Sequence, residues 1–310
     1  MGQILSEPVT TKESAYCQNS DLTVGSSCMQ GWRISMEDAH THILSLPEDP
    51  QASFFGVYDG HGGAKIAQYA GKHLHKFLVK QPKYMEGKYE KALKQAFLDI
   101  DSAMLNDKSL KDEFSGSTAI VCLLKAKQLY VANVGDSRAI ACVNGKVDVL
   151  SIDHKPSNET ELKRITAAGG WVEFNRVNGN LALSRALGDF LLKRNEEKIP
   201  EEQVITAYPD VQTRTITPEW EFIVMACDGI WDVMTNEEVV DFVRNRIGGG
   251  MCPEDICEDL MSRCLAPDIQ MGGLGCDNMT VIIIAFLHGE PYENLCAKCA
   301  STKSVGYPTN

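Results

Sequence analysis

The amino-acid sequence predicts an α+β fold: a central antiparallel β-sandwich of two sheets with helices on both sides, giving four α-β-β-α layers. Three observations support this fold class. Segments with strand character follow one another through short connections, which favours antiparallel pairing. Directly after one of them, Asn144-Gly145 is typical of a hairpin turn. The helical segments come in pairs between groups of strands, whereas a parallel doubly wound sheet would place one helix after each strand.

Each element is predicted from the spacing of apolar residues and from signals at its ends. Asn158 with Glu161, and Thr235 with Glu238, have the spacing of a capping box, so each pair predicts the start of a helix. Pro253 predicts the start of another helix. The predicted strands are 22–29, 39–46, 53–59, 117–124, 128–134, 138–143 and 278–287, and the predicted helices are 64–79, 89–105, 158–169, 235–247 and 253–265.

Composition and charge limit the class of protein. The chain has 310 residues, 44% hydrophobic and 23% charged, which is usual for a globular protein. The formal net charge is -12 and the lysines are scattered, so a nucleic-acid partner is not expected. The apolar run 281–287 is too short to cross a bilayer, no signal peptide is evident, and 11 cysteines read as reduced thiols. We therefore expect a cytoplasmic protein, and a nuclear location is the alternative that the sequence leaves.

The chain divides into three parts. Residues 1–20 are an N-terminal segment, 21–288 a single domain with an irregular insertion at about 169–208, and 289–310 a mobile tail. The start of the chain fits the pattern for acylation of Gly2, although a start codon followed by a small residue explains it equally well. If Gly2 is myristoylated, one acyl chain gives only peripheral, reversible membrane attachment. Cys296 and Cys299 lack the second pair that a zinc site needs.

Acidic residues follow apolar runs at several points. Asp59 ends the run Phe54–Tyr58 and Asp228 ends another, 221–227, each followed by glycine. Other acids lie beside glycine or near the ends of predicted strands, namely Glu37, Asp38, Asp136, Asp232 and Asp277, and Asp277 stands just before the last strand. If the strand ends meet at one rim, each close pair of carboxylates costs on the order of 4 kcal/mol, unless divalent cations lie between them. Oxygen ligands favour hard ions, so these acids predict Mg²⁺ or Mn²⁺ sites.

Seven segments in order resemble the motif series of the metal-dependent serine/threonine protein phosphatases of type 2C. The resemblance covers about residues 22–287, and its segments are WRISMEDAH, VYDGHGG, SGSTA, NVGDSRA, LSRALGDF, ACDGIWDV and CDNMTVIII. It implies a β-sandwich flanked by helices and two Mn²⁺ or Mg²⁺ ions bridged by Asp59. Glu37 and the Gly60 carbonyl would complete the ligands of one ion. Asp228 and Asp277 would serve the other, Asp38 would hold metal-bound water, and Asp136 and Asp232 match a weaker third site in some relatives.

The resemblance and the residues together imply hydrolysis of phosphoserine and phosphothreonine in proteins. Two ions sharing a water would supply a bridging hydroxide for in-line attack on phosphorus, so no phosphoenzyme is required. Arg33 can bind the phosphate with its planar fork of donors. His61, two residues after Asp59, is suited to protonate the departing oxygen. We expect a monomer that acts on phosphorylated proteins.

Two other functions fit parts of the sequence. A pseudoenzyme would keep the fold as a binding module, but such proteins lose metal-site acids and this chain keeps them. A metal-dependent nuclease shares the cation chemistry, but the acidic balance argues against it. For His40 and His42 the sequence predicts side-chain packing or solvent contacts rather than metal binding, and for Trp32 and Trp231 burial beside the metal rim. Gly116–Thr118 fits either a catalytic loop or the start of a strand, and Arg185 is expected to order the insertion.

Overall fold

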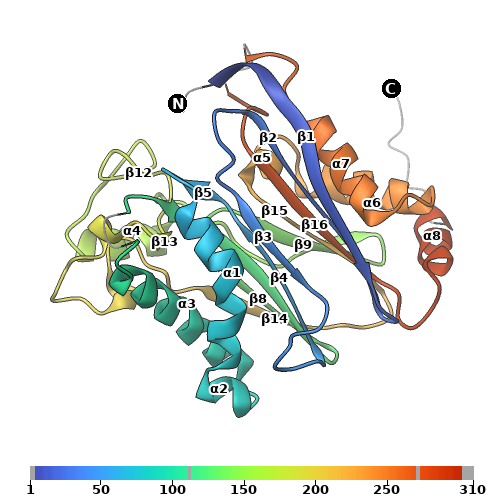
Figure 1. Ribbon diagram of the computed structural model, residues 1–310, viewed down its shortest axis with the longest axis horizontal. Coiled ribbons are helices and arrows are strands. Elements are labelled where there is room, and N and C mark those ends of the chain that lie inside the picture. Colours follow the sequence, from blue (N-terminus) through green and yellow to red (C-terminus); the bar gives the residue numbers. More distant parts are fainter. Residues whose placement is uncertain (1–3, 111–112, 270–272, 302–310) are drawn as a thin grey trace.

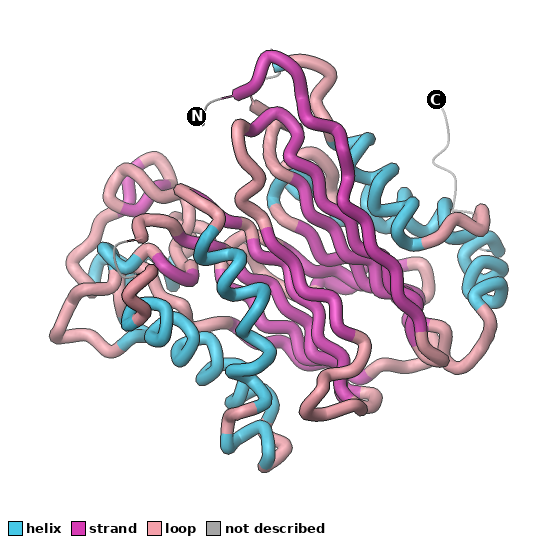
Figure 2. The backbone as a smooth tube through the Cα atoms, in the orientation of Figure 1, coloured by secondary structure: helices cyan, strands magenta, loops and turns pink. Residues whose placement is uncertain are grey.

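Two antiparallel sheets form the centre of the molecule (Figures 1 and 2). The computed structural model describes residues 4–110, 113–269 and 273–301. The first sheet has six strands in the order β1-β2-β16-β15-β9-β10, and the second has five in the order β14-β8-β7-β4-β3. Every neighbouring pair in both sheets is antiparallel. The predicted fold class, α+β with antiparallel sheets, is confirmed.

The strands of the six-stranded sheet are β1 (Ile4–Gln18), β2 (Leu22–Arg33), β9 (Arg138–Val143), β10 (Lys146–Val149), β15 (Trp220–Ala226) and β16 (Met279–Phe286). Those of the five-stranded sheet are β3 (Ala39–Ile43), β4 (Ala52–Tyr58), β7 (Ala119–Lys125), β8 (Gln128–Val134) and β14 (Asp210–Thr215). The short strands β5 (Gly60–His61), β6 (Gly116–Ser117) and β13 (Leu187–Gly188) pair with one another beside them.

Helices cover the outer face of each sheet (Figure 1). On the five-stranded sheet lie α1 (Lys65–Val79) and α3 (Tyr89–Asn106), joined by α2 (Pro82–Met85). On the six-stranded sheet lie α5 (Asp228–Trp231), α6 (Asn236–Gly248) and α7 (Pro253–Cys264). One apolar cluster fills the space between each helical layer and its sheet, and a third fills the space between the sheets. No helix in the described part of the chain is both long and apolar enough to cross a membrane.

The hairpin between β9 and β10 forms as predicted. Asn144 and Gly145 have φ of 50° and 73°, the left-handed values that a two-residue turn of this kind requires. Trp32 and Trp231 are buried as predicted, since they expose 6% and 7% of their surface.

The C-terminal segment is not a loose tail over its whole length, contrary to the prediction for 289–310. Residues Tyr292–Ser301 form α8, which packs against α6 and buries Leu295 and Cys299 in the cluster under the six-stranded sheet. The apolar spacing of one short helix is too weak a signal to predict this docking. Residues 302–310 lie outside the described residues.

The N-terminal segment is part of the domain. The sequence places the domain boundary at residue 21, but β1 begins at Ile4 and pairs along β2 as the edge of the six-stranded sheet. Its mixed polar sequence hides the pattern of a half-exposed edge strand. Gly2 lies outside the described residues.

Only one of the two predicted capping boxes forms. At α6, Thr235 and Glu238 exchange both hydrogen bonds. At α4 (Glu159–Ala167), the Asn158 side chain makes no cap and its amide donates to the Asp153 carbonyl, while the Glu161 carboxylate, the other half of a capping box, is bound by Arg164 and Arg185.

The predicted insertion is largely irregular. It contains the short hairpin β11 (Val172–Glu173) and β12 (Arg176–Val177), β13, and two 3₁₀ turns, Phe190–Leu192 and Pro200–Glu202. It has a small apolar core of its own, and the Arg185–Glu161 ion pair joins it to α4. The prediction that Arg185 helps to order this insertion agrees with that contact.

Candidate metal centre and active site

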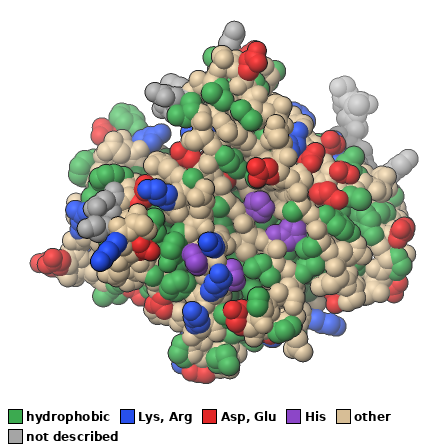
Figure 3. All heavy atoms as spheres, viewed as in Figure 1, with side chains coloured by type: hydrophobic (Ala, Val, Ile, Leu, Met, Phe, Trp, Pro, Cys, Tyr) green, Lys and Arg blue, Asp and Glu red, His purple; other side chains and the backbone are tan. Residues whose placement is uncertain are grey.

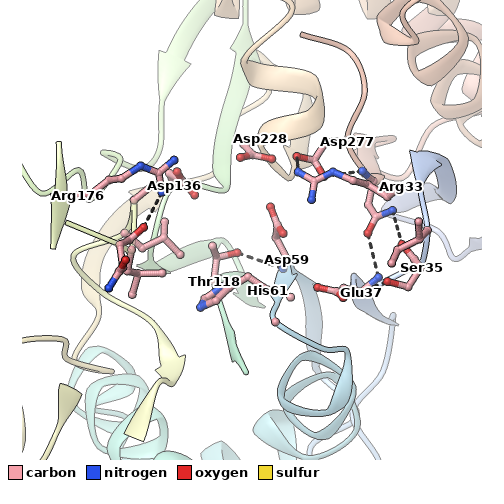
Figure 4. A pocket seen from close by; sticks show the side chains of 18 residues that line it. Arg33, Ser35, Glu37, Asp59, His61, Thr118, Asp136, Arg176, Asp228 and Asp277 are labelled. Atoms are coloured by element: carbon pink, nitrogen blue, oxygen red, sulfur yellow. Dashed lines mark hydrogen bonds and ion pairs between the residues drawn. The ribbon is translucent and has the colours of Figure 1, made fainter. Parts of the chain in front are cut away.

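Strand ends from both sheets meet around a cavity of about 490 Å³ (Figure 4). β4 and β8 of one sheet end there, as do β2 and β15 of the other, and β16 begins there. Of the predicted site residues, the structure brings together Arg33, Glu37, Asp59, Gly60, His61, Asp136, Asp228 and Asp277. Asp38 and Asp232 do not line this cavity. Figure 4 shows the carboxylates of Asp59, Asp228 and Asp277 near its centre, with Arg33 at one side.

The segment that follows β2 is held in place by Asn278. The Asn278 side-chain oxygen accepts the Glu37 N–H at 3.0 Å, and its amide nitrogen donates to the carbonyls of Gln30 and Ser35. Because Asn278 directly precedes β16, these bonds fix Glu37 relative to the six-stranded sheet.

Asp59 lies where β4 ends and β5 begins. Its N–H donates to Thr118 Oγ1 at 3.2 Å, and its carbonyl accepts the Thr118 N–H at 2.9 Å. The next residue must be glycine, because a Cβ at Gly60 would lie 2.3 Å from the Glu37 carbonyl oxygen. The backbone segments that carry Glu37 and Asp59 are therefore in close contact.

Burial and mutual repulsion disfavour the charged forms of the central acids. Burial, followed by the charges of Asp228 and Asp38, raises the pKa of Asp59 well above its usual range. Burial, followed by the charges of Asp136 and Asp277, does the same to the pKa of Asp228. Cations in the cavity would remove this cost, so the acids fit divalent metal ions.

Asp38 lies behind the cavity wall rather than in it. Its Oδ2 accepts a hydrogen bond from Thr280 Oγ1 at 2.7 Å, while its buried Oδ1 has no partner. Burial raises the pKa of Asp38 to about 7. Ligand atoms of Asp38, Asp59 and Cys227 lie within 4.8 Å of one another, and among the described residues this is the one such group of three. A buried carboxylate oxygen without a partner beside Asp59 is what a supporting residue of a metal site would leave when no ion is present.

The two residues predicted for a third ion, Asp136 and Asp232, both lie close enough to Lys155 for their charges to act on it. Asp136 is ion-paired with Lys155, whose Nζ lies 2.5 Å from Asp136 Oδ2. Asp232 lies in a neighbouring shallow depression with Arg138 and Trp231. Burial raises the pKa of Asp232, and the negative charge of Asp136 acts in the same direction. The structure thus places the Lys155 ammonium group at Asp136, where the resemblance implies a metal ion.

Arg33 forms an ion pair across the mouth of the cavity. Its Nη2 donates to Asp277 Oδ2 at 2.5 Å, and the two side chains are 40% and 33% exposed. The guanidinium is therefore held at the entrance, beside a predicted metal ligand and accessible to a substrate.

His61 forms an ion pair with Asp189, whose Oδ2 is 2.8 Å from Nε2. Burial alone would lower the pKa of His61, but the hydrogen bond and charge of Asp189 outweigh it and raise the pKa above its usual value. Gly116 makes room for the pair, since a Cβ there would lie 2.3 Å from Asp189 Oδ2 and 2.5 Å from His61 Nε2. Asp189 has φ of 49°, a left-handed backbone that turns its carboxylate toward His61.

Several site residues were not predicted individually. Asp189, Asn278 and Thr118 lie in segments quoted for the resemblance, but only their contacts reveal what they do. Gly116 and Ser117 form β6, so this segment is the start of a strand that also supports the site. Lys155 and the insertion residues Arg176 and Asn180 carried no sequence signal.

Comparison with known proteins agrees with this geometry. Residues 22–270 match the family described as Protein phosphatase 2C. A "Probable protein phosphatase 2C T23F11.1" of Caenorhabditis elegans is 61% identical over 300 residues, covering 97% of this chain and 84% of that protein. The chain belongs to the protein phosphatase 2C family. A "Protein phosphatase 2C homolog 2" of Schizosaccharomyces pombe is 48% identical over 299 residues, covering 95% of this chain and 81% of that protein.

Solved structures share the fold. A phosphatase from Toxoplasma gondii superposes with a TM-score of 0.76 at 28% identity, covering 89% of this chain and 96% of the other. As a member of the protein phosphatase 2C family, the chain is a protein serine/threonine phosphatase. It acts on phosphorylated proteins, and the family depends on metal ions.

Proposed function

We propose that this enzyme hydrolyses phosphoserine and phosphothreonine esters with two Mn²⁺ or Mg²⁺ ions, without a phosphoenzyme. The observation that carries the proposal is the meeting of acidic side chains from both sheets in one cavity, although they are far apart in sequence. When bound, the two ions would lower the pKa of a shared water, supply the hydroxide that bridges them for in-line attack, and offset charge on the phosphoryl oxygens.

The ligands divide between two positions. Asp59, at the centre, would be the shared ligand; Glu37 and the Gly60 carbonyl would hold one ion, and Asp228 and Asp277 the other. All of them line the cavity. The Asp38 oxygen without a partner supports this shell from behind.

Arg33 and His61 act on the substrate. Once a cation shares the charge of Asp277, the Arg33 guanidinium can direct its donors to phosphate oxygens at the entrance. His61 carries the proton that the departing serine or threonine oxygen needs, and Asp189 favours this protonated form.

A cysteine nucleophile is not needed, and the geometry does not offer one. Cys227 is the cysteine beside Asp38 and Asp59. It is fully buried, and burial followed by the charge of Asp38 raises the pKa of its thiol well above the usual range. A protonated, inaccessible thiol is a poor nucleophile.

A third ion at Asp136 and Asp232 would have to displace Lys155 from Asp136. We also propose a monomer in the cytoplasm, with peripheral membrane attachment if Gly2 is acylated.

The test is phosphate release from a phosphothreonine peptide. Activity should require Mn²⁺ or Mg²⁺, vanish with chelator, and fall at least about 100-fold in Asp59→Asn and Asp228→Asn, since each removes a ligand charge. Asp21→Asn, an exposed residue of the β1–β2 turn, is the matched control and should keep full activity. Turnover by Asp59→Asn at the rate of the control would overturn the proposal.

A further inference from the structure

A buried ion pair joins α3 to the insertion at a point outside the catalytic cavity. Asp101 of α3 pairs with Lys193, which follows the 3₁₀ turn Phe190–Leu192, and Lys193 Nζ lies 2.7 Å from Asp101 Oδ2. Neither of the two residues lines the catalytic cavity. Figure 3 shows charged side chains at the surface over the helices of this face, whereas those of Lys193 and Asp101 are only 8% and 14% exposed. The pair is therefore part of the packing between α3 and the insertion.

The Asp101 carboxylate binds a short segment of the insertion at two points. Its Oδ1 accepts the Gly188 N–H at 2.8 Å, and its Oδ2 accepts a hydrogen bond from Lys193 Nζ. The same Lys193 Nζ donates to the Ala186 carbonyl at 2.8 Å. These bonds fasten the segment between Ala186 and Lys193 at both ends, and Asp189 lies within it.

The backbone of this segment needs to be held from outside. Gly188 and Asp189 both have left-handed backbones, with φ of 74° and 49°. A residue other than glycine keeps such a backbone only where its surroundings hold it. On one side the Asp189 N–H donates to the Ser115 carbonyl at 3.2 Å, and on the other the Gly188 N–H donates to Asp101. The turn that directs the Asp189 carboxylate to His61 is therefore held from α3 as well as from the segment before β6.

The charge of Asp101 is compensated within the protein. Burial raises the pKa of Asp101, while the charge and the hydrogen bond of Lys193 act in the opposite direction. Removing one partner of a buried ion pair leaves the other without compensation and disturbs the structure around it. Replacement of either residue should therefore loosen the segment that carries Asp189.

We propose that Asp101 and Lys193 are positioning residues: they hold Asp189 where its carboxylate orients the ring of His61 toward the departing oxygen. This inference rests on the proposed role of His61 as the general acid. Asp189 Oδ2 is 2.8 Å from His61 Nε2, so the other ring nitrogen, Nδ1, is the one that can give up its proton. As the bond between phosphorus and the serine or threonine oxygen breaks, that oxygen takes the Nδ1 proton, and the ring is left neutral with its Nε2 proton toward Asp189.

The test compares two leaving groups, because a general acid matters only where the departing oxygen needs a proton. A threonine oxygen needs one, whereas p-nitrophenolate is a weak base and leaves without it. Asp101→Asn should lower kcat on a phosphothreonine peptide about 10-fold, which is part of the ~100-fold or more that a general acid contributes. KM should change little, and kcat on p-nitrophenyl phosphate should stay near the wild-type value.

Two further variants keep this test decisive. Lys193→Met removes the same ion pair from the side of the insertion, so it gives a second measurement if Asp101→Asn does not fold. Asp99→Asn, two residues earlier on α3, is the matched control, because its carboxylate binds Gln81 and Gln95 rather than the insertion. The control should match the wild type on both substrates.

His61→Gln, measured beside these variants, separates the inference from the proposed function. It should lose more activity on the peptide than Asp101→Asn and little on p-nitrophenyl phosphate, and adding Asp101→Asn to it should cause no further loss. If His61→Gln behaves in this way while Asp101→Asn matches the control, the positioning role is wrong and the proposed function stands. An equal loss of kcat on both substrates in Asp101→Asn also overturns the positioning role, because the ion pair would then support the fold or the metal site. If His61→Gln keeps the wild-type ratio of the two activities, the proposed role of His61 fails, and the positioning role fails with it.

Discussion

At the scale of single residues, the pair formed by His61 and Asp189 depends on a glycine. Gly116 has no side chain at the point where a Cβ would meet both members of the pair. The proton that we assign to His61 is favoured by the charge of Asp189, so separating the two side chains should affect the chemical step more than the fold.

We expect Gly116→Ala to lower kcat about 100-fold, the usual contribution of a positioned general acid, with a much smaller change in KM. Steady-state kinetics on a phosphothreonine peptide measures both. The control is Gly71→Ala in α1, where the new methyl group meets Ala39 Cβ at 3.5 Å, an ordinary contact. Equal kcat values in the two variants would show that the pair has no role in turnover.

At the scale of elements, a buried ion network fastens the insertion. Glu161 on α4 is 2% exposed and pairs with Arg164 and Arg185. Arg185 also pairs with Asp210 at the start of β14, and Asp210 pairs with His154. Three separate segments are therefore held by one carboxylate and its partners.

Removing the charge of Glu161 should loosen this insertion. Breaking one partner of a buried ion pair costs about 3 kcal/mol or more, so Glu161→Gln should raise hydrogen exchange in residues 172–206 while the sheets stay protected. Glu159→Gln, whose partner Lys163 is exposed, is the matched control and should have no effect. Unchanged exchange in Glu161→Gln would show that the network does not hold the insertion.

The stabilisation that this ion network gives the insertion should be lost in acid. Burial by itself would raise the pKa of Glu161, but Arg185 and Arg164 lower it from 4.5 to about 2. A carboxylate with a lowered pKa stabilises the fold above its unfolded value, and that stabilisation is lost as the pH falls from about 4.5 toward 2. Exchange in the insertion should therefore rise over this range in the wild type. The difference in exchange rate between wild type and Glu161→Gln should shrink as the pH falls, and a constant difference would show that the charge of Glu161 does not stabilise the insertion.

The docking of α8 gives a third prediction at this scale. Leu295 is 5% exposed and belongs to the cluster under the six-stranded sheet. Leu295→Ala should lower the free energy of unfolding by about 2–4 kcal/mol, as large-to-small changes in a core do. Asn294→Ala, on the exposed side of α8, is the control, and urea unfolding compares them. Equal stability would mean that the segment is the loose tail that the sequence suggests.

At the scale of the whole molecule, metal ions should stabilise the native state. Cations relieve the repulsion among Asp59, Asp228 and their neighbours and bind only where the two sheets have brought these acids together. At a metal concentration 100 times the Kd, one bound ion raises the free energy of unfolding by about 2.7 kcal/mol. Melting with chelator and with Mn²⁺ should therefore differ by several degrees, and the difference should be much smaller in Asp59→Asn. Identical melting of the wild type in both conditions would contradict this.

The sequence predicts most of the scaffold because its signals are local. Buried strands, the Asn144-Gly145 turn and the Thr235 cap each depend on neighbouring residues. The same pattern misleads at Asn158, because its amide bonds to the Asp153 carbonyl and Glu161 binds an arginine 24 residues away. The metal acids could be predicted because they lie beside glycine or at strand ends and within the motifs that carry the family resemblance. Asp189 could not, since its role exists only where the chain folds it against His61.

The apolar layer between the sheets also sets the spacing of the catalytic acids. Asp59 is fixed to one sheet and Asp277 to the other, and residues such as Val57, Ile120 and Ile282 fill the space that separates the sheets. A change in the thickness of that layer shifts one half of the ligand set against the other. If the proposed ligands hold the ions, core packing would help to set the ionic radius that fits between them, and we expect a distant apolar substitution to change the preference between Mg²⁺ and Mn²⁺ without touching a ligand.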